Sequence, residues 1–566
     1  MPFAKLPTSP EAFANAAWPE VLPYFEELAA RPLDLDTVES WLQDWSMLES
    51  LISEAAVLAE IVYTTDTADP QKEAAHLRFA GTIMPQMEEQ HIRLGKRLVD
   101  LGYETEALRT MVRSLRNQID IFRAANVPLI AEAQKLSARY QKITGAMTVL
   151  WEGEEKTIPQ LQPYLLDTDR ATRERAFRLQ AQPYLEQRAA IADLFDEMYA
   201  TRMQIARNVG FENYRDYVFR EKDRFDYTPA DCERLHAAIE QTFVPAVRRL
   251  YERRRERMGL DALRPWDVGV DPQGRPPLRP FEQVDTLVEG AARIFHNVEP
   301  TLGGYFDTLS REQLLDLESR IGKAPGGYCQ RLDYHRRPFI FMNAVGLASD
   351  VETLVHESGH AFHVFETAAL PLLWQRSCGM EMAEVASMSM ELLAAPYLDQ
   401  AHGGYYAADD YRRARAEHLE GILLLMPHIA SVDAFQHWIY TDPAGADRDA
   451  RDAAWLRIRS RFEQGIDWSG LEAERVARWY RQIHIFQYPF YYVEYGIAQL
   501  GALQIWRNSL KNQDGAVAGY RRALALGGTR ALPELFAAAG ARLLFDPASL
   551  RSLVDLVESA LVEFEG

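Results

Sequence analysis

The sequence predicts a mainly α protein, and the first evidence is the spacing of its apolar residues. Five long stretches rich in Ala, Leu, Glu and Arg place apolar side chains at helical intervals. They are residues 74–102, 105–144, 169–209, 229–258 and 411–440. Heptads are not sustained and no repeat recurs, so neither a coiled coil nor a solenoid is expected.

Each of these stretches contains a proline, which removes a backbone donor and crowds the preceding turn. The five are Pro85, Pro128, Pro183, Pro245 and Pro427. We therefore expect each stretch to be either a kinked helix or two shorter helices.

The chain has 566 residues, enough for two or more subdomains. Residues 145–157 combine an apolar run with a following Gly and acidic residues, which predicts a small hairpin. We expect this hairpin to close an N-terminal helical domain, residues 1–190, and residues 191–566 to form a second domain. Residues 264–281 contain five prolines and predict an ordered loop.

The composition argues against several kinds of partner. A formal net charge of -20 opposes general affinity for nucleic acids or anionic membranes, and no apolar run is long enough to span a bilayer. Pro7 and Pro10 interrupt the N-terminus, so no export signal is expected. Cys232, Cys329 and Cys378 are odd in number and widely spaced, which favours a reducing compartment, the cytoplasm.

Two short segments, residues 326–332 and 338–343, are rich in aromatic or β-branched residues and are bounded by Gly and Pro. They predict two strands of a small sheet ahead of a helix. Residues 338–343 can then bind an extended peptide by edge pairing, or the sheet can simply support the helix. The sequence favours neither interpretation.

The helix that follows carries residues with metal chemistry. Ser349 and Glu352 have capping-box spacing, which predicts a helix start there. His356 and His360 are four residues apart and share one helix face, where both imidazoles can bind one tetrahedral metal ion. Glu357 lies beside that face and can take a proton from the attacking water of a hydrolysis.

A catalytic zinc site usually takes three protein ligands and keeps one position open. A histidine ten residues after His356 is excluded as the third, because Glu366 stands there. A later glutamate is the alternative, and Glu381 and Glu384 both qualify because they lie near one helix face. His363 as a third ligand would require one straight helix to supply ligands over roughly 10 Å, so a contact with substrate, or packing, is expected instead.

Several motifs around this helix are specific to one family. They are Gly327-Tyr328-Cys329, Phe341-Met342-Asn343, the run from Asp350 to His363, and Ala383-Glu384-Val385-Ala386-Ser387. In these motifs the chain resembles the thimet oligopeptidase and oligoendopeptidase F metallopeptidases, family M3, and most closely the oligoendopeptidase F or Pz-peptidase-like branch. Weaker resemblance covers nearly the whole chain.

The resemblance implies an elongated, two-lobed helical zincin fold, with a small β-sheet beside the active-site helix and a deep substrate channel. It implies one Zn²⁺ held by His356, His360 and Glu384, with Ser387 completing a Glu-x-x-Ser element. It also implies that residues 191–566 form the catalytic domain, and that the channel admits unfolded oligopeptides but excludes folded proteins.

Residues 484–496 form a second element, a histidine followed by tyrosines. Pro489 suits the first turn of a helix, so Tyr488, Tyr492 and Tyr495 are expected on one face. On sequence alone such a cluster is more often packing. The resemblance implies that His484, with Tyr492 or Tyr495, binds substrate and stabilises the oxyanion.

Tyr488, Tyr491 and His363 are expected to contact the substrate. We expect a zinc-dependent endopeptidase that hydrolyses internal bonds of short, unfolded oligopeptides through a metal-activated water. The alternatives are a zinc carboxypeptidase of similar helical fold and a non-catalytic, metal-bound peptide-binding protein. Cys329 and Cys378 have no thiol-protease signature, so buried structural cysteine is the better interpretation.

Overall fold

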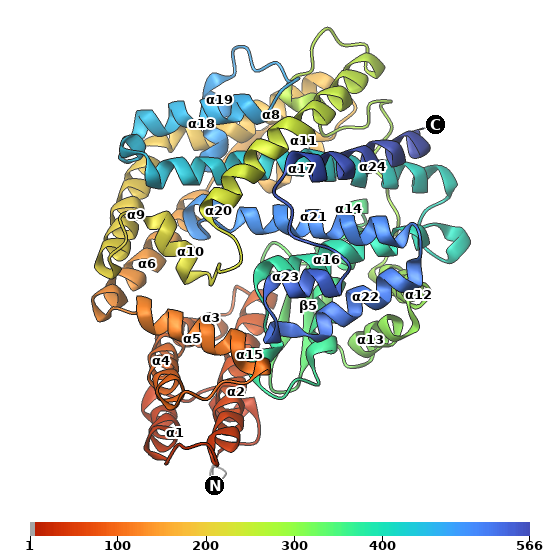
Figure 1. Cartoon of the computed structure of the whole chain (residues 1–566). Helices are drawn as coiled ribbons and strands as arrows, with labels where there is room; N and C mark the ends of the chain where they lie inside the picture. The colour runs from red at the N-terminus through yellow and green to blue at the C-terminus, as the bar shows by residue number, and fades with distance from the viewer. Residues whose placement is uncertain (1–5, 566) are drawn as a thin grey trace. The chain divides into compact units, whose positions relative to one another are not determined.

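The computed structural model describes residues 6–565, most of which lie in helices (Figure 1). The chain divides into two compact units, each assembled from separated stretches of sequence. The first unit comprises Met1–Asp120, Arg279–Arg412 and Ala498–Leu543; the second comprises Ile121–Leu278, Arg413–Ile497 and Leu544–Gly566. Within residues 6–565, three helices cross from one sequence range into the other: α17 (Ala408–Thr441), α21 (Tyr492–Ser509) and, by its last residue, α5 (Arg109–Ile121). A domain boundary at residue 190 stays a prediction.

The first unit combines helices from all three of its sequence ranges. They are α1 (Trp18–Ala30), α2 (Val38–Thr65), α3 (Pro70–Arg78), α4 (Met84–Leu101), α5 (Arg109–Ile121), α12 (Val284–Val298), α13 (Pro300–Arg311), α14 (Ala348–Thr367), α15 (Leu373–Arg376), α16 (Met380–Ala394), α22 (Gln513–Ala525) and α23 (Leu532–Ala538).

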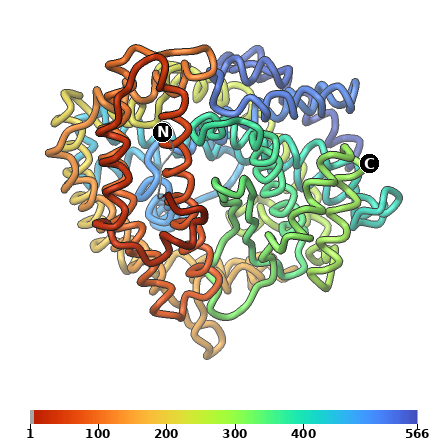
Figure 2. Tube along the Cα trace, turned by 90° about the horizontal axis from the view of Figure 1, so that it is seen from below, coloured from red at the N-terminus to blue at the C-terminus, as the bar shows by residue number. Residues whose placement is uncertain are grey.

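Aromatic side chains hold the N-terminal helices of this unit together. α1, α2 and α4 contact one another, and Figure 2 shows the red N-terminal helices side by side. Trp41 and Trp45 are buried on α2 with ring centroids 5.2 Å apart. Trp45 also contacts Trp374 of α15 at 4.4 Å. Segments far apart in sequence therefore share one core.

A three-stranded sheet adjoins α14. Its strands are β3 (Leu315–Glu318), β4 (Tyr328–Leu332) and β5 (Arg337–Ala344), in the order β3-β5-β4. β4 pairs antiparallel to β5, with Tyr328 opposite Phe341, and β3 pairs parallel to β5. Both predicted strands are present, and β3 is an addition.

The position of β5 corrects one expectation. β5 is the central strand, so its backbone groups are already paired on both sides. The expectation that an extended peptide pairs with residues 338–343 is therefore wrong. In this sheet only β3 and β4 have an edge to offer.

The second unit is almost entirely helical. Its helices are α6 (Val127–Gly145), α7 (Gln162–Leu165), α8 (Arg170–Glu186), α9 (Arg188–Val209), α10 (Tyr214–Glu221), α11 (Pro229–Arg257), α18 (Arg448–Phe462), α19 (Glu472–Tyr480), α20 (Ile483–Gln487) and α24 (Pro547–Glu565). The predicted hairpin consists of β1 (Thr148–Trp151) and β2 (Glu154–Thr157), which are antiparallel. Glu152 and Gly153 both have positive φ, as a two-residue I′ turn requires.

The stretches that contain the prolines differ in outcome, and two of them divide as expected. Residues 105–144 and 169–209 each form two helices, with Pro128 at the start of α6 and Pro183 near the end of α8. Pro245 and Pro427 lie within single long helices, α11 and α17. Pro85 follows a π-helical turn at Phe79–Ile83, whose wider bore relieves the collision between a proline ring and the carbonyl four residues earlier.

The proline-rich loop is ordered by a buried carboxylate. Asp267 accepts hydrogen bonds from Arg170 and Arg173 at 2.8–3.0 Å, and its side chain is fully buried. A short 3₁₀ turn, Pro265–Asp267, is the one helical element of this loop. Among the described residues, no helix has both the length and the apolar character needed to cross a bilayer.

Candidate metal centre

The helix α14 begins earlier than the sequence suggested. Leu347 is its N-cap, and the Asp350 carboxylate accepts hydrogen bonds from the amides of Leu347 and Val345, both at 2.8 Å. The expected cap at Ser349 is therefore wrong, because Ser349 already lies in the first turn. An acidic side chain in this turn also complements the helix dipole.

Three side chains converge where α14 meets α16. Nε2 of His356 and Nε2 of His360 lie 3.5 and 3.6 Å from Oε2 of Glu384. One donor atom from each residue falls within 4.8 Å of the others. Glu381 is buried on the same helix but is not part of this group. The two candidate glutamates thus differ in position, although sequence spacing could not separate them.

The close approach of α14 and α16 depends on Gly359. A Cβ atom added there would lie 2.5 Å from the carbonyl oxygen of Ala386 and 2.6 Å from Cα of Ser387. Only glycine fits at such a distance. Tyr520 of α22 donates a hydrogen bond to the same Ala386 carbonyl at 2.8 Å, which further fixes α16.

Two further side chains orient the converging groups. Oε1 of Glu391 lies 2.6 Å from Nδ1 of His356, on the opposite side of the ring from Glu384. The hydroxyl of Ser387 donates to Oε2 of Glu384 at 3.0 Å. Glu391 was not among the predicted site residues, yet it lies seven residues after Glu384 and so shares its helix face. That spacing was the available signal.

Burial and charge shift the pKa values of this group. Burial raises the pKa of Glu357 to about 7, and the Glu384 and Glu391 carboxylates add to the effect. Burial also disfavours ionised Glu384, but contact with His356 and the charge of His360 outweigh it and hold its pKa at about 2. Burial lowers the pKa of His360 to about 4. Burial acts likewise on His356, but Glu384 and Glu391 overcome it and raise its pKa well above the ordinary value.

These groups suit a divalent metal ion. Two imidazole nitrogens and one carboxylate oxygen match the donor set of catalytic zinc, and they leave a coordination position open. The histidine side chains are 25% and 20% exposed, so that position is accessible. The Glu357 carboxyl is buried next to His356 in the chain. The arrangement can therefore hold a metal ion and a proton acceptor together.

His363 is placed differently from the other two histidines. It is 7% exposed, and its Nε2 lies 3.8 Å from Sγ of Cys378. Burial lowers its pKa to about 3. A substrate contact by His363 stays a prediction. Burial also raises the pKa of the thiols of Cys378 and Cys329, so neither favours the thiolate that a nucleophile needs.

The structure gathers the late tyrosines around His484 within the second unit. The ring centroid of His484 lies 4.5 Å from that of Tyr492 and 5.9 Å from that of Tyr491. It lies 6.3 Å from those of Tyr488 and Tyr495. Burial lowers the pKa of His484 to about 4. Whether these residues act on a substrate stays a prediction.

The local structure of this cluster differs from the expectation. Pro489 does not begin a helix, because α20 ends at Gln487 and α21 begins at Tyr492. Pro489 instead lies in a turn in which Phe490 has a φ of 61°. Tyr492 and Tyr495 therefore share a face of α21, as expected, whereas Tyr488 precedes the turn and lies outside that helix.

A helix that bears His-Glu-x-x-His, with a glutamate from a second helix beside it, is the arrangement of a metallopeptidase. The model of peptidase family M3 matches residues 164–555, and the chain belongs to this family.

Two solved structures and one relative found by sequence agree with the assignment to this family. The structure titled Pz peptidase A with inhibitor 2 is 26% identical, with a TM-score of 0.89, covering 97% of this chain and 98% of the other. A structure described as putative oligoendopeptidase F is 28% identical, with a TM-score of 0.89 and 97% of each chain covered. An oligoendopeptidase F homologue of Borreliella burgdorferi is 21% identical over 74% of this chain and 70% of its own length.

Proposed function

We propose that the chain is a zinc-dependent endopeptidase that hydrolyses internal bonds of short, unfolded oligopeptides. The observation that carries the proposal is the convergence of His356, His360 and Glu384 within 4.8 Å, beside the buried Glu357. These three residues would hold one Zn²⁺, and Glu357 would act as the general base.

The chain's own residues supply the proton transfers. When bound, zinc lowers the pKa of water to roughly 7 and polarises the scissile carbonyl. Glu357 accepts a proton from the attacking water and delivers it to the leaving amine. A carboxyl pKa of about 7 suits a group that must do both at neutral pH. Glu391 keeps Nε2 of His356 turned toward Glu384.

The relatives and the sheet support the substrate class. Two of the similar proteins are named as oligoendopeptidase F or its homologue, which supports oligopeptides cleaved at internal bonds. β4 is an edge strand and contacts α14, which carries Glu357. This supports β4, in place of β5, as the strand that pairs with the substrate backbone.

The residues around His484 are proposed to bind the peptide. His484, with Tyr492 or Tyr495, would donate hydrogen bonds to substrate and oxyanion, and Tyr488 and Tyr491 would contact the peptide. Burial holds the pKa of His484 at about 4, so its ring is neutral at pH 7 and keeps one N–H donor. A donor aimed at the oxyanion contributes about 3 kcal/mol to the reduction of the barrier.

The proposed setting is the cytoplasm. None of the three cysteines forms a disulfide, which supports a reducing compartment. The net charge of -20 supports peptides over nucleic acids or anionic membranes as partners.

An internally quenched peptide blocked at both ends tests this function. An endopeptidase cleaves it, whereas a carboxypeptidase needs a free C-terminus and leaves it intact. Cleavage should stop on treatment with a zinc chelator and return when zinc is added. Tight zinc binding without chelator-sensitive cleavage would instead indicate a peptide-binding protein that lacks turnover.

A further inference from the structure

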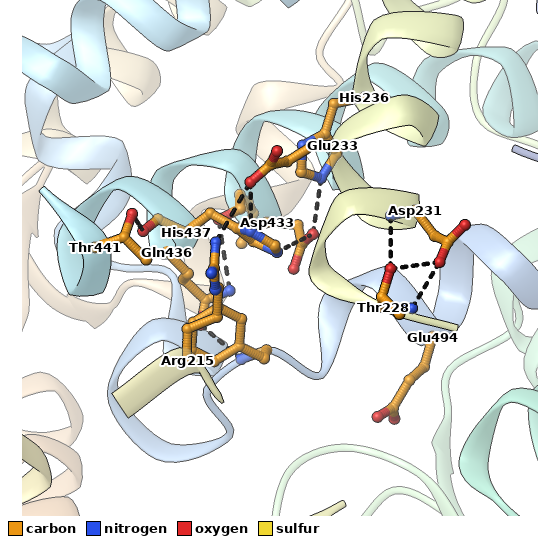
Figure 3. Close-up of polar contacts among 12 residues, drawn as sticks. Arg215, Thr228, Asp231, Glu233, His236, Asp433, Gln436, His437, Thr441 and Glu494 are labelled. Atoms are coloured by element: carbon orange, nitrogen blue, oxygen red, sulfur yellow. Dashed lines mark hydrogen bonds and ion pairs between the residues drawn. The ribbon is translucent and has the colours of Figure 1, made fainter. Parts of the chain in front are cut away.

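A second group of metal-ligand side chains lies in the second unit, between α11 and α17. Cys232 and His236 are four residues apart on α11, and Asp433 and His437 are four residues apart on α17. Each pair therefore shares one helix face. One donor atom each from Cys232, Asp433 and His437 falls within 4.8 Å of the others. Figure 3 shows His236, Asp433 and His437 pointing toward one another.

This group is buried. Cys232 and Asp433 are 0% exposed, and His236 and His437 are each 5% exposed. Nε2 of His236 lies 2.7 Å from Oδ2 of Asp433, which fixes the orientation of the carboxylate. A buried carboxylate and two buried imidazoles carry strong donors and acceptors away from water, so each of their polar atoms needs a partner.

Several of these atoms lack a hydrogen bond within residues 6–565. Oδ1 of Asp433 has no hydrogen-bond partner there, and neither has Nδ1 or Nε2 of His437. The carboxylate oxygens next to the His437 ring are Oδ2 of Asp433 at 3.3 Å and Oε1 of Glu233 at 3.8 Å. Glu233 in turn pairs with Arg215 at 3.3 Å. Oδ1 of Asp433 therefore has no hydrogen-bond partner among these residues, and the ring nitrogens of His437 have only ion-pair contacts with carboxylates.

We propose that Cys232, Asp433 and His437 bind a second divalent cation, with zinc as the best match. A thiolate and a carboxylate would neutralise its two charges, so the buried site would carry no net charge. Binding would release the thiol proton of Cys232, and any proton on His437, to solvent. Sulfur, nitrogen and oxygen donors together favour zinc over magnesium or calcium, which take oxygen ligands.

The role of this cation would be structural. The group is closed to solvent, and a cation there would tie the first turns of α11 to the C-terminal part of α17. Its effect would extend to the turn that carries the late tyrosines. The ring centroids of His437 and Phe490 lie 5.5 Å apart. Oε1 of Gln436 accepts a hydrogen bond from the Phe490 amide at 2.8 Å. Gln436 and His437 therefore both support the Phe490 turn.

Metal analysis of the full-length chain, purified without chelator, tests the proposal. Cys232→Ser and Asp433→Asn should each remove one equivalent of zinc from the wild-type content, and His360→Ala should remove a different one. The Cys232→Ser/His360→Ala double variant should lose both. A zinc content unchanged by Cys232→Ser and by Asp433→Asn would overturn the proposal.

Cobalt substitution gives a readout that does not depend on activity. A thiolate bound to cobalt(II) produces a charge-transfer band in the near ultraviolet, and the His356 group contains no thiolate. The wild type should show this band, and Cys232→Ser should lose it. A Cys329→Ser/Cys378→Ser chain retains Cys232 alone and should keep the band, which decides the matter even if Cys232→Ser fails to fold. Absence of the band from both the wild type and the Cys329→Ser/Cys378→Ser chain would overturn the proposal.

The experiments distinguish a failure of the proposed peptidase function from a failure of the proposed second cation site. His360→Ala should abolish peptide cleavage and leave the cobalt band of the second group intact. If the chain proves not to be a peptidase, the band still reports on Cys232. If the band is absent, chelator-sensitive cleavage still reports on His356 and His360.

Discussion

The two proposed cation sites are built alike and differ in their surroundings. Each combines two side chains four residues apart on one helix with a third from another helix. In the first site the histidine side chains are 25% and 20% exposed. In the second, the side chains of Asp433 and His437 are 0% and 6% exposed. Helical spacing makes a ligand set, and exposure decides whether a substrate can reach it.

The histidines of the two units also differ in their electrostatic partners. His356 lies between Glu384 and Glu391, which raise its pKa, whereas burial lowers the pKa of His484 among tyrosine rings. The first arrangement favours a protonated ring, because carboxylates lie on both sides of it. The second keeps a neutral ring that can donate a hydrogen bond.

The largest expected effect tests the base that only the first site has. Glu357→Gln should reduce kcat by about 10²–10⁴-fold, because the proton acceptor is lost. Zinc content should not change, since Glu357 is not among the proposed ligands. Glu352→Gln is the matched control, because Glu352 is an exposed residue on the same helix and should retain activity. Near-normal turnover in zinc-loaded Glu357→Gln would refute the mechanism.

The next largest effect is on the zinc affinity of the His356 site, which should change without a change at the Cys232 site. Glu391→Ala should weaken zinc binding at the His356 site by about 10–100-fold, because Nδ1 of His356 loses the partner that orients the ring. Glu391→Gln, which keeps an acceptor oxygen, should recover part of the affinity. Competition with a chromogenic chelator measures both variants. The cobalt band of the Cys232 group should be the same in each, and a change there would contradict independent sites.

A smaller effect concerns the packing that brings the first site together. Gly359→Ala should destabilise the fold by about 1–3 kcal/mol, because the new Cβ collides with the α16 backbone. Gly304→Ala is the control, since Gly304 lies in α13 with nothing within 4 Å of an added Cβ. That change should be neutral or stabilising. Denaturant unfolding of the two variants measures the difference, and equal stabilities would remove Gly359 as the cause of the close approach.

The smallest effect concerns the neutral histidine. The pKa of His484 falls from 6.5 to about 4 on folding, so the folded state binds the proton less tightly than the unfolded state. Its contribution is therefore fully present above pH 6.5 and is lost as the pH falls toward 4. After allowance for partial exposure, the loss should be about 1–2 kcal/mol. His484→Gln should lose less stability than the wild type over this range, and parallel pH profiles would show that His484 is not the titrating group.

Local pattern was a good guide to the helices and to the shared face of the two histidines of the first site. The spacing of His356 and His360 fixes their shared face, and a helix follows the small sheet as expected. The family resemblance named Glu384 over Glu381, and Glu384 is the one that converges with the histidines. Periodicity reports on residues close in sequence, and these residues lie on two helices joined by a short connection.

Features that depend on tertiary structure were not predicted from the sequence. The N-cap of α14 lies at Leu347 and not at Ser349, because the Asp350 carboxylate accepts hydrogen bonds from the amides of Val345 and Leu347. β3 is short and half charged, so its pairing with β5 depends on a neighbour that its own residues do not reveal. The Cys232 and Asp433 segments are some two hundred residues apart, and no local pattern connects them.

The central position of β5 has a consequence for selectivity. If the substrate pairs with β4 as proposed, it becomes the fourth strand of the sheet, and recognition is then largely through its backbone amides and carbonyls. Those groups are the same in every sequence except at proline, so many different peptides can be accepted. Methylation of alternate backbone nitrogens should block binding in one register and spare it in the other, while the side chains stay unchanged.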